Sequence, residues 1–417
     1  MSSRLKSPAR TKPAAAPPAV PETSRNGLEI SDLVPRFRDE GYSLDQVARR
    51  RAWLESQTGA ALNHTGRLSF DSEDLRGNIE NPIGVAQVPV GVAGPILVRG
   101  KYAQGAFYVP MATSEGALVR SYERGMAALT RSGGVEVSVL RDENHISPSF
   151  FFADVSSAAA FTEWIPQQMP DLQAAAATTT RHGRLVACEC FQTGRQVILD
   201  LRFSTGDAQG MNMIAKAADA ICRWIESRFP SSSHLLFSGM CSEKRASGFV
   251  IARGKGKRVT AGARIPRSIL KLYLHVTPEQ LAHVWHSTVI GHIYAGSIGY
   301  NAHYANGLAA IFIATGQDVA NVANSACGIT SFELDSEGIF ASVTLPALSV
   351  ATIGGGTSLP TQREALAIMG CYGAGKARKF AEIVAAALLG GELSMGAAIA
   401  AGEFVAAHER YGRNRPK

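Results

Sequence analysis

The chain is poor in cysteine and in charge, and its cysteines are scattered. Six cysteines occur in 417 residues, and only Cys188 and Cys190 lie close together. A single Cys-x-Cys without a second cluster is a weak zinc signal, so we expect reduced thiols that share one face of a strand, no metal site and a cytoplasmic protein. Charged residues make up 18% of the chain and hydrophobic residues 46%, which is typical of a globular protein.

A long uncharged apolar run is also missing. Residues 383–408 are rich in Ala and Gly, but Glu392 and Glu403 interrupt them. We therefore expect buried helices here rather than a membrane span, which needs about 20 consecutive apolar residues. The N-terminal segment carries charges without an apolar core, which argues against a signal peptide, and we expect no membrane anchor.

The net charge of +7 is concentrated at the two ends of the chain. Residues 1–25 carry a net charge of +4 and residues 409–417 a net charge of +3, so the body between them is neutral. Basicity confined to the tails weakens a nucleic-acid-binding function. We expect residues 1–27, which are rich in Pro, Ala and Ser, to be a disordered tail, and residues 409–417 to be a flexible basic tail.

Hydrophobic periodicity predicts a mixture of helices and strands. Strict alternation over residues 196–203 predicts a half-buried strand whose odd-numbered residues face the core. The strand–strand–helix–strand order within residues 139–236 suggests a small α+β unit. The other predicted elements are short helices within 28–75 with Ser43 as a cap, helices over 116–129 and 209–228, a strand over 234–238, a hairpin over 247–265, a helix that starts at a Thr277 capping box, and an apolar strand over 339–350.

Glu115 stands out because it is a carboxylate at the end of a small, uncharged segment. It follows Met-Ala-Thr-Ser and precedes Gly116, so a ligand can approach the backbone closely. A carboxylate on an apolar shelf has its charged form disfavoured and can hold a proton near neutral pH. The alternative is a Glu at the start of the following helix, with Thr113 or Ser114 as the N-cap.

Two glycine-rich stretches offer anion-binding chemistry. Residues 370–376 match the Gly-x4-Gly-Lys of a P-loop, but Ala377 follows where a P-loop requires Ser or Thr, which argues against a nucleoside triphosphatase. Residues 204–213 join the alternating strand to a helix, whose N-terminal N–H groups favour phosphate. The alternative is a simple turn capped by Asp207. No Gly-x-Gly-x-x-Gly follows a predicted strand, so we do not expect a standard Rossmann domain.

Several long motifs in one order resemble the HMG-CoA reductase family, in particular its animal and archaeal class. The resemblance covers about residues 76–410, and several motifs in one order are much more specific than any single one. The motifs are ENPIG (80–84), PVGVAGP (89–95), VPMATSEG (109–116), GDAQGMNM (206–213), GSIGYNAHYAN (296–306), TGQD (315–318), IGGGT (353–357) and GELSMGAAIAAG (391–402).

The resemblance implies an α+β fold, with a large, mainly helical catalytic domain and an inserted small ferredoxin-like NADP-binding domain. The implied segments are an N-terminal helical segment over 28–75, the large domain over 76–138 and 237–408, and the small domain over 139–236. Family members are dimers or tetramers with shared active sites, so we expect a homo-oligomer.

The implied activity is NADPH-dependent reduction of an acyl-CoA thioester to an alcohol, through a hemithioacetal and an aldehyde. The default substrate is HMG-CoA and the product mevalonate, as in isoprenoid biosynthesis. The family's catalytic residues match Glu115, Lys244, Asp318 and His408. A lysine cation suits the oxyanion that hydride attack creates, and two carboxyl groups beside it can shuttle protons. The implied role of His408, on a swinging C-terminal segment, is to protonate the coenzyme A thiolate.

The binding positions also follow from the resemblance. Thr180 and Arg181 match the Ser-Arg pair that contacts the 2′-phosphate, which favours NADPH over NADH because a guanidinium binds phosphate oxygens bidentately. The other implied cofactor-binding positions are Asp207, Gly210, Met211, Asn212, Gln317, Gly355 and Gly356. The implied substrate-binding positions are Ser121, Arg124, Ser138, Ser238, Glu243, Arg245, Ser287 and Asn306.

Two of these positions depart from the family. The Arg and the Lys that hold the free carboxylate of the glutaryl group correspond to Ser138 and Ser287. Recognition of that carboxylate is weakened unless Arg245 or His286 compensates, because a buried charge needs a partner. Three functions therefore stay open: reduction of HMG-CoA, reduction of another acyl-CoA or carrier-bound thioester without the glutaryl carboxylate, and nucleotide binding without catalysis.

Overall fold

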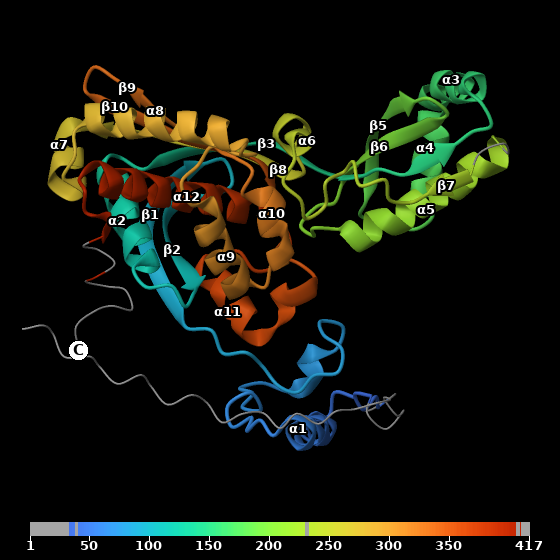
Figure 1. The fold of residues 1–417 in the computed structure, drawn as a ribbon, viewed down its shortest axis with the longest axis horizontal. Coiled ribbons are helices and arrows are strands. Elements are labelled where there is room, and N and C mark those ends of the chain that lie inside the picture. Colours follow the sequence, from blue (N-terminus) through green and yellow to red (C-terminus); the bar gives the residue numbers. More distant parts are fainter. Residues whose placement is uncertain (1–32, 38–40, 230–232, 406–408, 410–417) are drawn as a thin grey trace, which may run out of the picture.

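The structure is a computed structural model in which a large and a small body share one sheet. The described residues are 33–37, 41–229, 233–405 and 409. Figure 1 shows the large body at the left, the small body at the right, and α1 (Leu44–Thr58) below the large body. The predicted disordered tail, His408 and the basic tail after Glu409 lie outside the described residues.

In the described part of the chain the strands form a ten-stranded sheet that continues from the large body into the small one. Its order is β7-β4-β6-β3-β8-β10-β9, while β1 pairs with β2 and β3, and β5 pairs with β6. The bounds are β1 Val90–Gly100, β2 Gln104–Ala112, β3 Val135–Ile146, β4 Ser149–Phe151, β5 Arg184–Thr193, β6 Gln196–Ser204, β7 Ser233–Leu235, β8 Gly256–Pro266, β9 Ile329–Leu334 and β10 Gly338–Leu348. The predicted strands over 196–203 and 339–350 are confirmed as β6 and β10.

Helices cover this sheet, and several predicted starts are confirmed. The Ser43 hydroxyl accepts the N–H of Gln46 at the start of α1, and Thr277 and Gln280 form the predicted capping box of α8. The remaining helices are α2 Leu118–Arg131, α3 Val155–Trp164, α4 Met169–Ala177, α5 Met211–Arg228, α6 Gly248–Arg253, α7 Arg267–Ile269, α8 Pro278–Ala295, α9 Tyr304–Thr315, α10 Val322–Ser325, α11 Pro360–Ile368 and α12 Ala377–Ala400, with 3₁₀ turns η2 Ser72–Leu75, η3 Ile165–Gln168, η5 Val319–Asn321 and η6 Gly355–Ser358 and the π turn η4 Leu270–Leu274.

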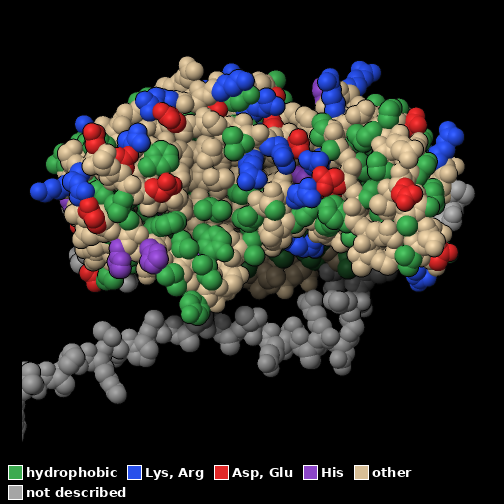
Figure 2. All heavy atoms as spheres, turned by 90° about the horizontal axis from the view of Figure 1, so that it is seen from above, with side chains coloured by type: hydrophobic (Ala, Val, Ile, Leu, Met, Phe, Trp, Pro, Cys, Tyr) green, Lys and Arg blue, Asp and Glu red, His purple; other side chains and the backbone are tan. Residues whose placement is uncertain are grey.

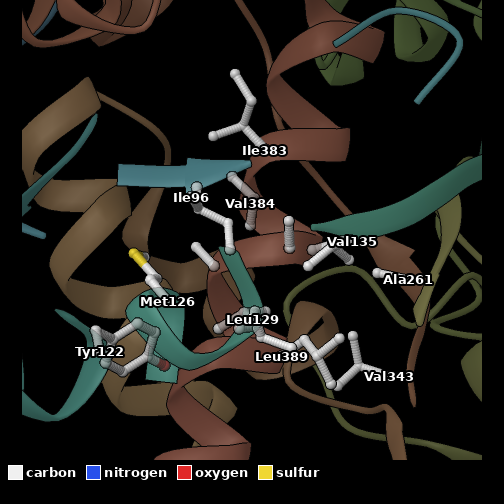
Figure 3. Packing of buried hydrophobic residues seen from close by; sticks show 14 of the residues in the cluster. Ile96, Tyr122, Met126, Leu129, Val135, Ala261, Val343, Ile383, Val384 and Leu389 are labelled. Carbon is white, nitrogen blue, oxygen red and sulfur yellow. The ribbon is translucent and has the colours of Figure 1, made fainter. Parts of the chain in front are cut away.

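The core of the large body is built around α12. Figure 3 shows Ile383, Val384 and Leu389 of this helix among side chains of α2, β1 and β3, and all three are fully buried. Each such side chain contributes about 1.5–3 kcal/mol on burial. Among the described residues, α12 is the one helix long and apolar enough to cross a membrane, but 83% of its most apolar 18-residue window is buried inside the protein. The prediction of a buried helix is confirmed.

Close helix packing in this core requires a glycine. A Cβ added at Gly125 of α2 would lie 1.8 Å from the backbone oxygen of Gly390 of α12, which is far too short for two non-bonded atoms. The two backbones therefore approach each other directly, because glycine has no side chain to separate them. This contact fixes α2, and with it the segment that carries Glu115, against the C-terminal half of α12.

Two buried carboxylates on α12 hold loops rather than facing solvent. Glu382 accepts the N–H groups of Lys101, Tyr102 and Ala103 in the β1–β2 connection, at 2.6–3.2 Å. Burial raises the pKa of Glu382, while these N–H groups act in the opposite direction. Glu392 plays the corresponding part ten residues further along, where it accepts backbone N–H groups before α9. Charges that interrupt an apolar helix therefore organise the loops around it.

The small body has ferredoxin-like topology. Its order along the chain is β4, α3 with α4, β5, β6, α5 and β7, and its order in the sheet is β5-β6-β4-β7 with antiparallel neighbours. This is the β-α-β-β-α-β arrangement. The odd-numbered residues of β6 from Val197 to Phe203 are fully buried in a second hydrophobic cluster, as predicted, but Asp200 on the opposite face is fully buried as well. Helices α3 and α4 carry weak amphipathic patterns and were not predicted.

One strand and a group of ion pairs join the two bodies. Strand β3 pairs with β8 as far as Glu143 and with β6 from Asn144 onwards. Lys and Arg side chains gather where the bodies meet, with acidic side chains among them (Figure 2). Arg202 and Arg253 both contact Glu189, at 2.9 and 2.8 Å. Arg202 and Arg253 are therefore paired within the protein.

The predicted hairpin over 247–265 is wrong in its first half. Residues 248–253 form helix α6, and only the second half is a strand, β8. The Ser247 hydroxyl accepts the N–H of Val250, which starts α6, and Gly254 with φ of 81° ends it. The apolar alternation suggested a strand, but a capping serine and a C-terminal glycine favour one short helix.

Candidate functional site

A large cleft lies at the junction of the two bodies, and we call it the Lys244 cleft. Its volume is about 1070 Å³, and both bodies line it. Ten of the site residues predicted from the sequence line this cleft: Gly210, Met211, Asn212, Glu243, Lys244, Arg245, Gln317, Asp318, Gly355 and Gly356. Residues that are up to 146 positions apart in the sequence, from Gly210 to Gly356, therefore meet in one cleft.

Lys244 and Asp318 form an ion pair in this cleft. The Lys244 Nζ lies 2.7 Å from an Asp318 carboxylate oxygen, and both side chains are a little under half exposed. The hydrogen bond that Lys244 donates to Asp318 raises the pKa of Lys244, so the lysine stays charged at neutral pH. Asp318 also accepts the N–H of Ala320, so it is at once a cap and a cation partner.

The loop that presents Lys244 is strained. Ser242 and Lys244 have φ values of 51° and 57°, which side-chain-bearing residues seldom adopt. Such strain persists only where the surroundings fix the backbone, and it occurs most often at functional sites. Here Glu243 provides the anchor, because it lies 2.9 Å from the buried Lys255 and accepts a hydrogen bond from Gln209. The ammonium of Lys244 is thus held in position by its neighbour in the sequence.

The cofactor-binding side of the cleft consists of an open helix N-terminus and a glycine turn. Helix α5 begins after Gly210, whose φ is 79°, and no side chain caps its N–H groups. These N–H groups favour an anion such as a phosphate. A Cβ built at Gly355 would meet nothing within 4 Å, so this turn also leaves its space free. The residues present fit a phosphate-bearing dinucleotide.

Two predicted cofactor ligands use their polar groups within the protein. The Asp207 carboxylate accepts the N–H groups of Gly375 and Ala377, at 2.7 and 3.0 Å. It therefore caps α12, which belongs to the other body. The simple-turn alternative, in which Asp207 caps α5, is wrong. The P-loop-like segment before α12 follows a helix rather than a strand, and the Gly375 N–H of this segment is bound to Asp207. Gln317 lines the cleft, but its amide bonds Thr315 and Ala351.

Glu115 lies in a second, smaller cavity, which we call the Glu115 cavity. Its volume is about 360 Å³, and its lining includes Ser121, Arg124, His303 and Asn306. Asn306 donates to Glu115 at 3.4 Å. Glu115 is exposed in this single chain, so the apolar burial expected around it is absent here.

Glu115 is also not part of the cap of the next helix. The N-cap of α2 is Ala117, which makes no side-chain cap bond. The Thr113 hydroxyl accepts the N–H of Glu115 itself instead. Neither Thr113 nor Ser114 is therefore the N-cap, and the capping alternative is wrong.

Other predicted substrate positions in this cavity are tied to α12. The Ser121 hydroxyl bonds the Ser394 hydroxyl at 3.2 Å, and Arg124 donates to the same hydroxyl and to the Ser394 backbone oxygen. Arg124 also contacts Glu403 at 3.3 Å. Ser121 and Arg124 thus stand together as predicted, and their polar groups are already engaged.

Among the described residues, the structure does not bring Glu115 into one site with Lys244 and Asp318. Glu115 is absent from the lining of the Lys244 cleft, and Lys244 and Asp318 are absent from that of the Glu115 cavity. Six predicted binding residues line neither of the two: Thr180, Arg181, Asp207, Ser138, Ser238 and Ser287. The Thr180 hydroxyl accepts the N–H groups of His182 and Gly183, and Ser238 donates to a backbone oxygen. Ser138 and Ser287 are exposed on β3 and α8.

Sequence reasoning missed His303, which lines the Glu115 cavity. It is 7% exposed, and neither ring nitrogen has a hydrogen-bond partner. The motif GSIGYNAHYAN contains both His303 and Asn306, so the signal was present, but only the asparagine was selected from it. Its buried, unpaired state depends on the packing of α9 against α2 and α12, which the sequence does not display.

Fold and clefts define the class of protein. It is an α+β enzyme in which a ferredoxin-like unit is inserted into a larger helical body, with an ion-paired lysine in the cleft that both bodies line. A family model described as hydroxymethylglutaryl-coenzyme A reductase matches residues 46–413. The chain therefore belongs to the hydroxymethylglutaryl-coenzyme A reductase family, which consists of oxidoreductases.

Relatives and solved structures agree with this assignment. Proteins named 3-hydroxy-3-methylglutaryl-coenzyme A reductase from Pyrococcus abyssi and Aeropyrum pernix are 43% and 44% identical to this chain, and the matches cover 93% and 90% of it and 100% and 91% of the relatives. The structure of the reductase of Streptococcus pneumoniae superposes with a TM-score of 0.64 at 20% identity, covering 84% of this chain and 96% of that one. That likeness concerns the fold. The archaeal relatives agree with the predicted class.

Proposed function

We propose that the protein reduces HMG-CoA to mevalonate with NADPH as the reductant. The supporting relatives carry that enzyme's name and match this chain almost end to end. The observation that carries the proposal at the level of chemistry is the Lys244–Asp318 pair, 2.7 Å apart, in the cleft that also holds the open N-terminus of α5. A cation beside a phosphate-binding helix end is what hydride delivery to a thioester carbonyl requires.

The proposed residue roles follow from charge. NADPH supplies the hydride in two successive transfers, so one thioester, two NADPH and two protons give the alcohol, coenzyme A and two NADP⁺. Lys244 stabilises the oxyanion of the hemithioacetal, and Asp318 keeps the ammonium charged and oriented. His408 protonates the departing thiolate. Glu115 supplies the proton that converts the aldehyde oxygen into a hydroxyl.

The active site is proposed to form between two copies of the chain. Glu115 and Lys244 line different cavities of one chain, although the proposed reaction needs both at one carbonyl. The surface also carries exposed apolar side chains, with Val90 and Val92 of β1 exposed by 63% and 55% and Tyr294 of α8 by 90%. Exposed apolar groups of this kind are typical of interfaces. We propose a homodimer or tetramer in which the Glu115 cavity of one copy faces the Lys244 cleft of the next.

Binding of the two ligands is divided between the bodies in this proposal. Residues 139–236 form the NADP(H)-binding domain, with Arg181 at the 2′-phosphate, and residues 76–138 and 237–408 form the catalytic domain. Coenzyme A is held by Ser121 and Arg124. Arg245 is exposed in the Lys244 cleft, so it is placed to take the glutaryl carboxylate in the absence of cations at Ser138 and Ser287. The protein is proposed to be cytoplasmic.

A panel of thioesters tests the proposal. Purified full-length protein is given NADPH with HMG-CoA, acetyl-CoA or butyryl-CoA, and both NADPH loss and product are measured. We expect HMG-CoA to be the preferred substrate, with two NADPH consumed per thioester and mevalonate as the product. Consumption of one NADPH would indicate that the reaction stops at the aldehyde. Preference for a thioester without a distal carboxylate would favour the second candidate function, which the exposed Ser138 and Ser287 motivate.

A further inference from the structure

The polar groups that line the Glu115 cavity are paired with one another, with one exception. Glu115 accepts from Asn306, Ser121 bonds Ser394, and Arg124 contacts both Ser394 and Glu403. The exception among the described lining residues is His303, whose Nδ1 and Nε2 both lack a hydrogen-bond partner. The cavity therefore holds one imidazole whose hydrogen-bonding capacity is unused.

The surroundings of His303 fix its position. It is the N-cap residue of α9, and its own backbone N–H donates to the buried Glu392 at 2.9 Å. Its ring meets the ring of Tyr122 edge to face, with centroids 5.3 Å apart. Its side chain does not cap the helix, although a polar side chain at an N-cap commonly does. The ring is thus held beside the cavity by its backbone and by an aromatic neighbour.

Two other described histidines each have one ring nitrogen beside a carboxylate. His145 is 1% exposed, and its Nδ1 lies 2.9 Å from Asp200. His234 lies 2.7 Å from Glu226. A buried polar group without a partner carries a desolvation cost, so the rule is that such groups are bonded. His145 Nε2 and His292 Nδ1 are also buried without a partner, but at His303 both ring nitrogens are, beside a cavity of about 360 Å³, and a bound ligand would remove the cost.

The geometry points to His303 as a substrate-positioning residue. We propose that its imidazole hydrogen-bonds an oxygen of the acyl group that is bound beside Glu115. His303 and Asn306 are three positions apart at the start of α9, a spacing that places both on one face, and Asn306 already bonds Glu115. An acyl oxygen near Glu115 therefore lies within reach of both. This inference rests on the proposed reduction of an acyl-CoA and adds a residue to it.

Replacement of the ring tests the inference. His303→Phe keeps a planar aromatic ring and removes both unpaired nitrogens, so we expect the free protein to melt at a higher temperature. The same variant is expected to lose about 10- to 100-fold in kcat/KM for the thioester, the range that loss of one hydrogen bond to a ligand produces, while KM for NADPH stays unchanged. His303→Gln, which restores an amide near the Nε2 position, is expected to recover part of that loss.

His292→Phe is the matched control. His292 Nδ1 is also buried without a partner, but it lines a different, small cavity of about 30 Å³. We expect this variant to keep wild-type kcat/KM. If His303→Phe retains kcat/KM within about twofold, or if KM for NADPH rises equally, the positioning role is wrong.

A binding measurement separates this inference from the proposed function. The increase in melting temperature on addition of HMG-CoA is recorded for the wild type and for His303→Phe in the absence of NADPH. A wild type without turnover would contradict the proposed function. A ligand-induced shift that is present in the wild type and reduced in the variant would still support the role of His303 in binding. Equal shifts in the two proteins would overturn it.

Discussion

The Lys244 cleft and the Glu115 cavity are built in different ways. The cleft, of about 1070 Å³, is formed by loops, a helix N-terminus and glycine turns, and its lysine stands on strained backbone. The cavity, of about 360 Å³, is formed by the ends of α2, α9 and α12, and its polar groups are mostly paired. Backbone N–H groups suit a phosphate-bearing ligand, whereas rigid helices suit placement of one reacting group. Neither region alone holds the proposed catalytic set.

Loss of either proposed catalytic residue should have the largest effect. We expect Lys244→Ala to lower kcat by about 10²–10³-fold, because the oxyanion loses its cation, and Glu115→Gln to lower it comparably. Steady-state NADPH oxidation with HMG-CoA measures both. Lys271→Ala, which changes an exposed lysine on the η4 turn, serves as the control and should leave kcat unchanged. Full activity of Lys244→Ala would show that the cleft is not the reaction site.

Mixing the two inactive variants tests whether the two regions come from different chains. If each site combines a Glu115 cavity with a Lys244 cleft from another copy, co-refolded variants should recover roughly a quarter of wild-type activity, since half of the dimers are mixed and each has one intact site. Each variant refolded alone is the control. No recovery, in preparations that are shown to be oligomeric, would mean that both residues act within one chain.

Arg181 tests how far cofactor recognition extends beyond the cleft. The residue is exposed and lies outside the cleft lining, in a turn that Thr180 fixes by two hydrogen bonds. We expect Arg181→Ala to lower the preference for NADPH over NADH by about 10- to 100-fold, because a bidentate contact to phosphate is lost. Initial rates with both nucleotides give the ratio, and Arg195→Ala is an exposed control in the same body. An unchanged ratio would remove Arg181 from the cofactor site.

Asp207 tests whether the cleft depends on the tie between the two bodies. Because its carboxylate caps α12, Asp207→Ala should destabilise the protein by about 1 kcal/mol and raise KM for NADPH several-fold, with a smaller effect on KM for the thioester. Asp154→Ala removes the N-cap of α3 and is the matched control. It should cost a similar free energy of unfolding without a change in either KM. Equal changes in both KM values for Asp207→Ala would contradict a specific role in the cleft.

Glu403 tests whether the pairing inside the Glu115 cavity competes with the substrate. Its carboxylate contacts Arg124 at 3.3 Å and His275 at 3.1 Å, and both contacts are partly exposed. We expect Glu403→Gln to lower KM for the thioester by about two- to fivefold, because Arg124 is released for the phosphates of coenzyme A and exposed ion pairs are weak. Glu409→Gln is a control of the same type. A higher KM would mean that Glu403 helps to hold the cavity open.

The smallest expected effect is a shift in the pH dependence of kcat/KM when the partner of Lys244 is replaced. Asp318 raises the pKa of Lys244, so the charged lysine persists to a higher pH than an ordinary lysine, and its benefit is lost only as the pH rises through the folded-state pKa. In Asp318→Asn the alkaline limb of the residual kcat/KM should therefore move to lower pH. Asp219→Asn, which changes the exposed partner of Arg223, should leave the limb in place. An alkaline limb that does not move would assign it to another group.

Local signals in the sequence predicted much of the fold. The Thr277 capping box, the Ser43 cap and the alternation of β6 each depend on residues within one or two turns of one another, and all three are present in the structure. The same local reasoning failed at residues 247–253, where alternation and capping compete over a few residues. In the candidate site, too, some predictions were confirmed and others were wrong. Lys244 and Asp318 do meet, but Asp207 and Gln317 direct their polar groups elsewhere.

By itself the sequence determined which side chains can do the chemistry, which helices are apolar, and which family the chain resembles. Only the tertiary structure decided where those side chains work. It placed Glu115 and Lys244 in different cavities, used Asp207 to cap a helix 170 residues away, and left His303 buried without a partner. The physical reason is that a cap or a periodic face is set by near neighbours, whereas burial and pairing across the chain depend on packing that brings distant segments together.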